Sequence, residues 1–326
     1  MKNIHLLSQT FAAAHATPFG VMVKKEVADH IRSRRFLVML LLVVLVFAGT
    51  LYISMSHIRQ APADPDRNFV FLKLLTLSDG TLPTFHTFLS FLGPLLGIAL
   101  GFDAINSEYN NRTLVRLLAQ PVYRDNLLLA KFCGALLVTG VLFLSLVLLM
   151  IGGGMIFTGV KPEPAEVLRI LTFVVLNVVY IGFWLSLAIA LSVRFRNVAT
   201  SALVAIGIWL FFTVFYPILV NVVVKALVPD GYLLPEQVMS YNRLLLSLLR
   251  LDPGQLYTDA ATTLLMPSVR SLGALSMEQM AGAIPSPLSF TDSLMIVWPQ
   301  VTGLLAATAL CFALAYSLFM RKEVRA

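Results

Sequence analysis

Six long apolar stretches, separated by polar segments, dominate the pattern along this chain of 326 residues. They cover positions 36–56, 85–105, 127–151, 168–193, 199–224 and 294–320, and their centres contain no Lys, Arg, Asp or Glu. A helix rises about 1.5 Å per residue, so about 20 apolar residues cross the roughly 30 Å hydrocarbon core of a bilayer. Because a helix also satisfies its own backbone hydrogen bonds, the pattern predicts six membrane-spanning helices.

The composition supports the same fold class. Hydrophobic residues make up 58% of the chain and charged residues 13%, with a mean hydropathy of +0.84, whereas an ordinary soluble domain has about 25% charged residues. One charge at a helix centre costs about 2.5–3.5 kcal/mol on membrane-insertion scales, so six uncharged windows are not expected of soluble core helices. We therefore expect an all-α, polytopic membrane protein.

The distribution of basic residues sets the expected orientation. If both termini are cytoplasmic, the cytoplasmic segments hold 15 of the 24 basic residues and 6 of the 17 acidic ones. That side then carries a formal charge of +9 and the outer side −2, which agrees with the positive-inside rule. We interpret the positive balance as topology and contact with anionic lipid, not as nucleic-acid binding.

These elements divide the chain into four parts. Residues 1–35 form a cytoplasmic N-terminal segment, and residues 36–224 hold five spans with a cytoplasmic connection near 108–124. Residues 225–293 form an outer segment that six prolines interrupt, and residues 294–326 hold the sixth span and a basic cytoplasmic tail. Between the prolines, short helices are predicted to form a small cap on the outer surface. Long loops are often functional, and a structural lid is an equally good interpretation.

The segment before the first span has the pattern of an amphipathic helix. Thr17-Pro18 is typical of a helix start, and Phe19, Val23 and Val27 recur every four residues. Charged residues surround this apolar side, and the ones we single out are Lys24, Lys25, Glu26, Arg34 and Arg35. Such a helix suits the cytoplasmic membrane interface; the alternative is a solvated basic lead-in to the first span.

The connection between the second and third spans predicts a docking element. Leu114, Leu117 and Leu118 share one helical face, Arg112 and Arg116 share another, and Pro121 ends the helix. A short apolar and basic helix at the cytoplasmic end of two spans has the shape to enter a groove on a soluble partner. The alternative is an amphipathic loop helix that rests on lipid.

Small and polar residues within the spans predict helix packing. Gly93, Gly97 and Gly101 repeat every four residues on the second span, a spacing that lets two helices approach closely. A contact within the chain and a contact with a second chain fit this spacing equally. Polar residues such as Asn177 and Tyr216 are expected to form hydrogen bonds between helices rather than to contact a substrate.

Sequence signals for catalysis, metal binding or a cofactor are absent. The nearest approach to a phosphate-binding loop, 154–161, has Val160 where the lysine belongs. The sequence contains no zinc-binding His/Cys pattern and no Gly-x-Ser-x-Gly elbow. We therefore assign no catalytic residue, no metal site and no cofactor to this chain. The spans also lack charged groups for ion coupling, so the energy source is expected on another chain.

The connection after the second span resembles the permeases of type-2 ABC exporters. The resemblance rests on segments 104–109, 112–114, 117–124 and 127–131, where a glutamate-containing turn precedes Thr-Leu, a leucine helix, Pro-Val-x-Arg and a leucine run ending in lysine. The basic residues at 24–26 and 32–35 are similar to the elbow helix of that family. Phe102-Asp103-Ala104-Ile105 and Lys131-Phe132 most resemble the branch of nitrous-oxide-reductase maturation permeases. Arg112 departs from the family pattern, which usually has glycine there.

The resemblance implies a permease that acts with separate cytoplasmic ATPase subunits, which hold ATP and Mg²⁺. It also implies a second permease chain, as homodimer or heterodimer, in the cell membrane of a prokaryote. A coupling helix near 108–124 would receive the ATP-driven closure of the ATPases. The residues so implied are Glu108, Tyr109, Arg112, Thr113, Leu114, Arg116, Leu117, Leu118, Pro121 and Arg124. The expected function is export; the alternative is a channel-like or scaffolding membrane protein that ATP does not drive.

Overall fold

The computed structural model describes residues 18–60, 69–78, 80, 82–113, 124–227, 235–268 and 287–321. Every regular element within these ranges is helical. Six helices are long and apolar enough to cross a membrane: Arg34–Ile58, Phe85–Asn110, Arg124–Thr158, Pro164–Arg194, Val198–Leu227 and Phe290–Arg321. Each of them contains the core of a predicted span, so the prediction of six spans and an all-α fold is confirmed.

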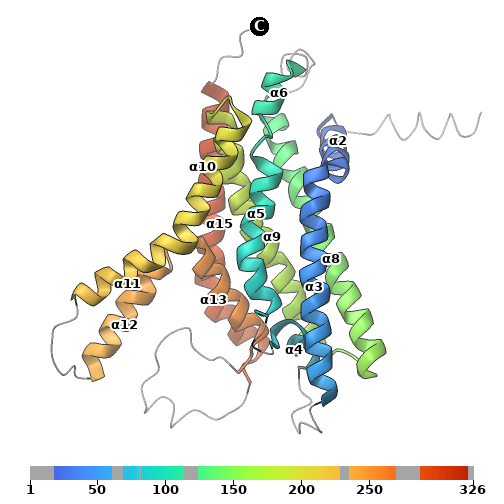
Figure 1. Cartoon of the computed structure of the whole chain (residues 1–326), viewed down its shortest axis with the longest axis vertical. Helices are drawn as coiled ribbons and strands as arrows, with labels where there is room; N and C mark the ends of the chain where they lie inside the picture. The colour runs from blue at the N-terminus through green and yellow to red at the C-terminus, as the bar shows by residue number, and fades with distance from the viewer. Residues whose placement is uncertain are drawn as a thin grey trace, which may run out of the picture.

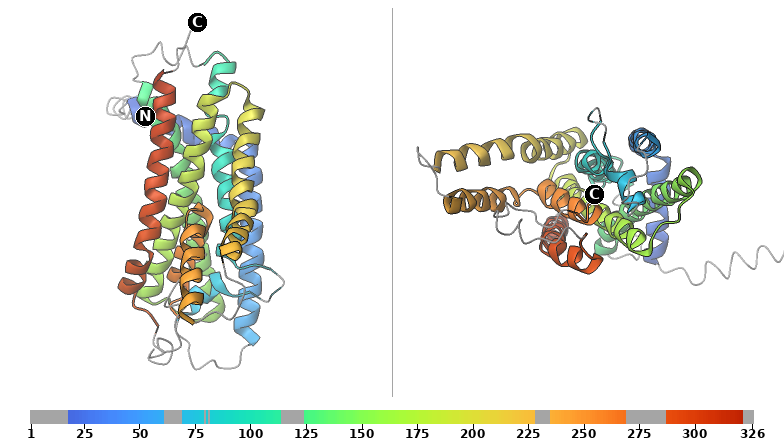
Figure 2. Two further views of the ribbon diagram at one scale, coloured as in Figure 1. Left: turned by 90° about the vertical axis from the view of Figure 1, so that its left-hand side faces the viewer. Right: turned by 90° about the horizontal axis from the view of Figure 1, so that it is seen from below.

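The spans stand side by side in one bundle with α9 (Pro164–Arg194) at its centre (Figures 1 and 2). α9 packs against α5 (Phe85–Gly101), α8 (Arg124–Thr158) and α15 (Phe290–Arg321). In an 18-residue apolar stretch of α9, 72% of the residues are buried. In the corresponding stretches of the spans that start at Arg34, Val198 and Phe290, 22% or less are buried. A helix that is apolar all round suits a central position, because every side can be covered by another helix.

The second span contacts α9 along the glycine stripe, Gly93, Gly97 and Gly101. A Cβ atom on Gly97 would lie 2.7 Å from the Ile181 carbonyl oxygen, and one on Gly101 would lie 2.9 Å from the Leu185 carbonyl oxygen. No side chain fits at these distances, so glycine permits the close approach of the two backbones. The structure therefore places this stripe in a contact within the chain.

The fifth span contains a wide turn at its centre. α10 (Val198–Leu210) is followed by the π-helical turn η1 (Phe211–Phe215) and then by α11 (Tyr216–Leu227), and the Tyr216 N–H donates to the Phe211 carbonyl. Pro217 explains this turn, because proline lacks an N–H and its ring would clash with the carbonyl four residues earlier in a regular helix. Beyond it, α11 diverges from the bundle beside α12 (Pro235–Leu249) (Figures 1 and 2).

Part of the segment 225–293 lies inside the bundle. Asp252 caps α13 (Pro253–Leu265) by accepting a hydrogen bond from the Gly254 N–H at 2.9 Å. α13 packs against α9, α15 and α5, and its residues Tyr257, Ala260 and Leu264 are fully buried. The sequence predicted a cap on the outer surface here. The apolar side of α13 is covered by the spans and not by water, and the position of the segment on the outer side stays a prediction.

The short helices mark the two ends of the bundle. α2 (Pro18–Arg32), which precedes α3 (Arg34–Gln60), and α6 (Asn106–Asn110) lie at one end, and α4 (Val70–Thr76) lies at the other (Figure 1). The last turn of α15 is at the same end as α2, as an even number of spans requires (Figure 1). That this end faces the cytoplasm, with α2 at the membrane interface, stays a prediction.

Candidate functional site

The first residues of the connection after the second span are hydrogen bonded to the central helix, α9. The backbone N–H groups of Ile105 and Asn106 both donate to Ser192 Oγ, at 2.9 and 3.1 Å. Ser192 is fully buried near the end of α9. Its hydroxyl satisfies N–H groups that would otherwise lack a partner at the start of a helix. α6 is thereby fixed to α9.

The turn between α9 and α10 holds the other side of α6. The Asn110 side-chain amide donates to the Arg196 carbonyl at 3.1 Å. The Arg196 guanidinium lies 5.4 Å from the centre of the Tyr109 ring, within the range of a cation–π interaction. Tyr109, predicted as a coupling residue, therefore contacts a basic turn that the chain reaches only after two further spans.

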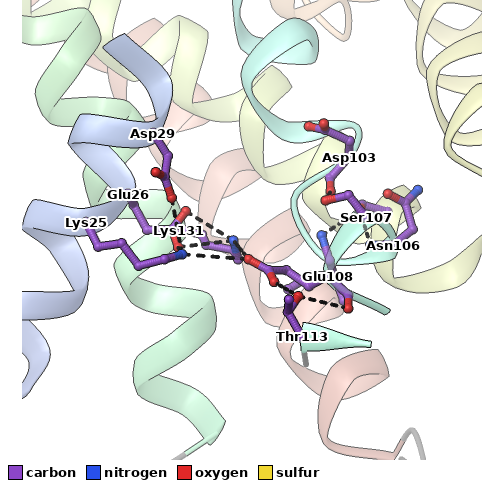
Figure 3. Close-up of polar contacts among 11 residues, drawn as sticks. Lys25, Glu26, Asp29, Asp103, Asn106, Ser107, Glu108, Thr113 and Lys131 are labelled. Carbon is purple, nitrogen blue, oxygen red and sulfur yellow. Dashed lines mark hydrogen bonds and ion pairs between the residues drawn. The ribbon is translucent and has the colours of Figure 1, made fainter. Parts of the chain in front are cut away.

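A buried lysine joins α6 to two more helices. Lys131 Nζ on α8 lies 3.1 Å from Glu26 Oε2 on α2 and 3.3 Å from Glu108 Oε1 on α6 (Figure 3). The side chains of Lys131 and Glu26 are each 7% exposed and that of Glu108 is 16% exposed. Charges so little exposed to water are costly unless they are paired, so removal of one partner is strongly unfavourable. We call Lys25, Glu26, Glu108 and Lys131 the ion network.

The rim of the ion network is exposed. Lys25 Nζ lies 3.1 Å from Glu26 Oε1 and 3.2 Å from Asp29 Oδ2. Partial burial opposes the charge on Lys25, but the neighbouring carboxylates outweigh it, and the pKa of Lys25 is raised above its ordinary value. The Thr113 hydroxyl donates to the Glu108 carboxylate, which ties the residues after α6 to the same network (Figure 3).

Close packing of α2 on α8 brings the network together. A Cβ atom on Gly134 would lie 2.9 Å from Glu26 Cβ and 3.6 Å from the Val23 carbonyl oxygen. Gly134 is one helical turn after Lys131, so the two residues share a side of α8. The missing side chain lets α2 approach closely enough for Glu26 to reach Lys131.

A second ion pair ties the first span to the end of α5. Arg35 forms an ion pair with Asp103, and its guanidinium lies 4.8 Å from the centre of the Phe102 ring. Between this pair and the ion network lies a cavity of about 450 Å³, which His30 and Arg34 also line. Burial lowers the pKa of His30. The ends of five helices thus meet around one charged space.

The structure brings together part of the residue set that the sequence predicted. Lys25, Glu26, Glu108 and Thr113 meet at the ion network, and Tyr109 lies beside it on α6. Lys24 and Arg124 are exposed, and Arg34 and Arg35 begin α3. The predicted residues that lie outside the described ranges are Leu114, Arg116, Leu117, Leu118 and Pro121.

Arg112 keeps a backbone conformation that favours glycine. Its φ is 57°, in the left-handed region, and its N–H donates to the Tyr109 carbonyl at 3.1 Å. The departure from the family pattern at this position therefore leaves a left-handed turn in place. An arginine adopts it at the end of α6.

Sequence reasoning did not assign Lys131 or Ser192 to the site. The available signal for Lys131 was its position as the one charge within the apolar run 127–151, because a charge in a span needs a partner. Its main partner, Glu26, precedes it by 105 residues, so spacing along the chain could not identify it. Ser192 carried no signal, because a serine in a span is common in helix packing.

Comparison with known proteins identifies the family of the chain. The chain matches the family model of ABC-2 family transporter proteins over residues 21–324. It is 27% identical over 310 residues to the probable ABC transporter permease protein NosY of Pseudomonas aeruginosa, covering 93% of this chain and 98% of that protein. It is 26% identical over 306 residues to the protein of the same name from Stutzerimonas stutzeri, covering 92% and 97%. The chain therefore belongs to the ABC-2 family of transporter proteins, as a multi-pass membrane permease of an ABC transporter.

Proposed function

We propose that this permease couples ATP hydrolysis on separate cytoplasmic ATPase subunits, which bind ATP and Mg²⁺, to the outward movement of a substrate. The observation that carries the proposal is the placement of Lys131. Lys131 joins Glu108, the first residue of the segment 108–124, to α8 and to Glu26 on α2. A segment anchored in this way can transmit force to the spans.

The anchoring contacts suggest how a push would travel. Closure of the ATPases would press on the segment 108–124, which continues from α6. α6 is hydrogen bonded to α9 through Ser192 and ion-paired to α8 through Lys131. Because Lys131, Glu26 and Glu108 have little access to water, their ion pairs resist separation. Movement of α6 would therefore move the ends of α8, α9 and α2 together instead of bending a loop.

The remaining partners follow from the same proposal. The end of the bundle that carries α2 and α6 would face the cytoplasm of a prokaryotic cell, with α2 as the elbow helix at the membrane surface. A second permease chain, identical or different, would complete the transporter. Together with lipid, it would cover exposed apolar sides such as those of the fifth span, where 17% of the residues in an 18-residue apolar stretch are buried.

The alternative is a channel-like or scaffolding membrane protein that ATP does not drive. Purification in mild detergent separates the two functions. A permease should elute with a soluble subunit that contains Walker motifs, whereas a scaffold should elute without one. An ATPase encoded beside the gene for this chain would favour the permease.

Coupling is tested with the reconstituted complex of permease and ATPase. We expect Leu117→Asp, Arg116→Glu and Arg124→Glu to lower transport-coupled ATPase activity while the amount of inserted protein is unchanged. Lys161→Glu is the matched control, because Lys161 is exposed in the connection between α8 and α9, away from the segment 108–124. Full activity in Leu117→Asp would contradict the coupling role.

Orientation has its own test. With Cys133 and Cys311 replaced by alanine, a cysteine at Asn110 should be inaccessible to a membrane-impermeant maleimide on intact cells and accessible in inverted vesicles. Modification on intact cells would place α6 outside and overturn the proposal.

A further inference from the structure

α13 reaches the middle of the bundle. The Tyr257 hydroxyl, in the second turn of α13, donates to Asn177 Oδ1 at 2.9 Å, and Asn177 lies near the middle of α9. The Tyr257 ring also stacks on Tyr180, with centroids 4.4 Å apart. At the other end of α13, the Leu264 carbonyl accepts from Arg169, close to the start of α9. α13 therefore runs along half of α9 and begins at its centre (Figures 1 and 2).

The turn between α12 and α13 lies at the same depth beside the fifth span. The Tyr216 hydroxyl donates to the Leu248 carbonyl at 2.6 Å, and Tyr216 directly follows the π-helical turn at the centre of that span. The mid-point of the fifth span thus contacts this turn, and the mid-point of α9 contacts the second turn of α13. α12 and α13 form a hairpin that enters the bundle from the end carrying α4 and turns back halfway (Figure 1).

This hairpin brings charged residues to a depth where the spans have none. Arg250, Asp252 and Asp259 lie at the turn or in the first turns of α13. Ionisable groups at such a depth are costly, and they usually pair with one another or face a water-filled path. The sequence argued against charged groups near the midplane from the spans alone. The segment between the spans supplies them.

The charged groups at the turn have different roles. Asp252 caps α13, and its carboxylate accepts a hydrogen bond from the Gly254 N–H. Asp259, whose side chain is 9% exposed, accepts from Gln255 Nε2 at 2.7 Å and from Arg250 Nε at 3.3 Å. Asp259 is therefore a buried carboxylate that orients the Arg250 guanidinium through Nε.

The outward part of Arg250 is free to bind. Its side chain is 38% exposed, and its two terminal nitrogens form no hydrogen bond to any residue in the part of the chain that the structure describes. A guanidinium held at Nε still presents a planar pair of donors, which matches a carboxylate, phosphate or other oxyanion. The exposed charge at this depth is thus cationic.

We propose that Arg250, positioned by Asp259, is an anion-recognition residue on the substrate path, and that the transported substrate carries an oxyanion group. The inference rests on the proposed export function and adds a substrate class to it. It requires that the turn between α12 and α13 be reached by water and that the guanidinium act on anions that arrive there.

A cysteine reporter beside Arg250 tests both requirements without knowledge of the substrate. Ser247 is exposed and lies one turn before Arg250, and among the residues that the structure describes its Oγ bonds only to the Leu244 carbonyl of its own helix. Ser240 is the matched control two turns earlier on α12, with a similar bond to the Gln237 carbonyl. Ser247→Cys and Ser240→Cys would be made in the complex with its ATPase, with Cys133 and Cys311 replaced by alanine. Arg243 would be replaced by glutamine in both, because it is exposed on α12 one turn from each reporter and would add its own charge at both positions.

The probes are two membrane-impermeant methanethiosulfonate reagents, an anionic sulfonate and a cationic trimethylammonium. Both should modify Ser247→Cys. The ratio of anionic to cationic rates should be about threefold or more above the ratio at Ser240→Cys, because one nearby charge in a partly hydrated space has about this effect. Arg250→Gln should remove the difference and Arg250→Lys should keep most of it. The double variant Arg250→Gln with Asp259→Asn should behave like Arg250→Gln, which guards against misfolding caused by an unpaired carboxylate.

Two results would overturn the inference. One is modification of Ser240→Cys but not of Ser247→Cys, which would mean that water does not reach the turn. The other is a rate ratio that Arg250→Gln leaves unchanged. The nucleotide response is a separate readout. If the modification of Ser247→Cys is charge-selective but its rates do not change with ATP and vanadate, the result would support the anion site. It would count against the proposed coupling alone.

Discussion

Lys131 Nζ lies 3.1 Å from Glu26 Oε2, and this pair joins the third span to the helix that precedes the first span. Both side chains are buried, and Glu108 shares the same ammonium at 3.3 Å. Lys131→Met would remove the buried cation that both carboxylates share and leave them with Lys25, whose side chain is 47% exposed. We expect a loss of about 3–5 kcal/mol in the free energy of unfolding, the usual effect of breaking a buried pair from one side. Thermal unfolding in detergent, followed by tryptophan fluorescence, measures it.

Two matched variants show whether burial is the reason. Lys25→Met removes an ammonium whose side chain is 47% exposed, and exposed pairs contribute little. Lys131→Met combined with Glu26→Gln removes one of the stranded charges and should recover part of the loss. Equal destabilisation by Lys25→Met and Lys131→Met would contradict this account.

His30 should make stability depend on pH below neutrality. Burial lowers the pKa of His30, and Lys131 acts in the same direction; together they outweigh the opposite effect of Glu26, Asp103 and Asp29. The unfolded chain therefore binds a proton below about pH 6.5 more readily than the folded chain does. Stability should fall as pH decreases through this window and rise again toward pH 7 and above.

The midpoint of thermal unfolding between pH 7.5 and 5.5 tests this dependence. His30→Gln should reduce its slope, while His57→Gln, an exposed position on α3, should leave the slope as in the unchanged protein. A slope that persists in His30→Gln would assign the effect to another group.

Arg112→Gly should stabilise the turn after α6. The left-handed φ of 57° costs a residue with a Cβ atom about 1–2 kcal/mol, and glycine avoids this cost. The greater freedom of glycine in the unfolded chain offsets about 0.5–1 kcal/mol of the gain. Arg112→Ala removes the same charge and keeps the strain, so the difference in unfolding midpoint between the two variants isolates the backbone effect. Equal midpoints would show that the charge, and not φ, is what matters at this position.

The spans were predictable because lipid constrains them so strongly. A membrane helix must have a minimum length and an apolar surface, and both properties can be read from the order of residues along the chain. α2 was predicted as a helix for a similar reason, since its apolar residues recur every four positions. The pattern did not show that Glu26 lies on the buried side, because the reason is a lysine on another helix.

Lateral neighbours were not predictable. Lipid is as apolar as a neighbouring helix, so hydropathy does not distinguish a surface that packs on α9 from one that faces lipid. The glycine stripe predicted a close contact without naming the partner. The region of α13 was assigned to the outer segment because prolines divide residues 225–293 into short pieces between two spans. Only the structure shows that Tyr257 reaches Asn177.

Gly97→Ala should destabilise the bundle more than alanine at other glycines. Its Cβ would lie 2.7 Å from the Ile181 carbonyl oxygen, and this backbone atom cannot yield unless α9 moves, so we expect a loss of about 1–3 kcal/mol. At Gly93 the nearest atom, at 3.2 Å, belongs to the Tyr180 ring and would have to move by only a few tenths of an ångström, so the loss there should be smaller. Gly207 has nothing within 4 Å of its Cβ position, and alanine there should gain about 0.5–1 kcal/mol through helix propensity. Unfolding midpoints should therefore rise in the order Gly97→Ala, Gly93→Ala, Gly207→Ala, and an unchanged midpoint for Gly97→Ala would mean that α5 and α9 do not touch along the glycine stripe.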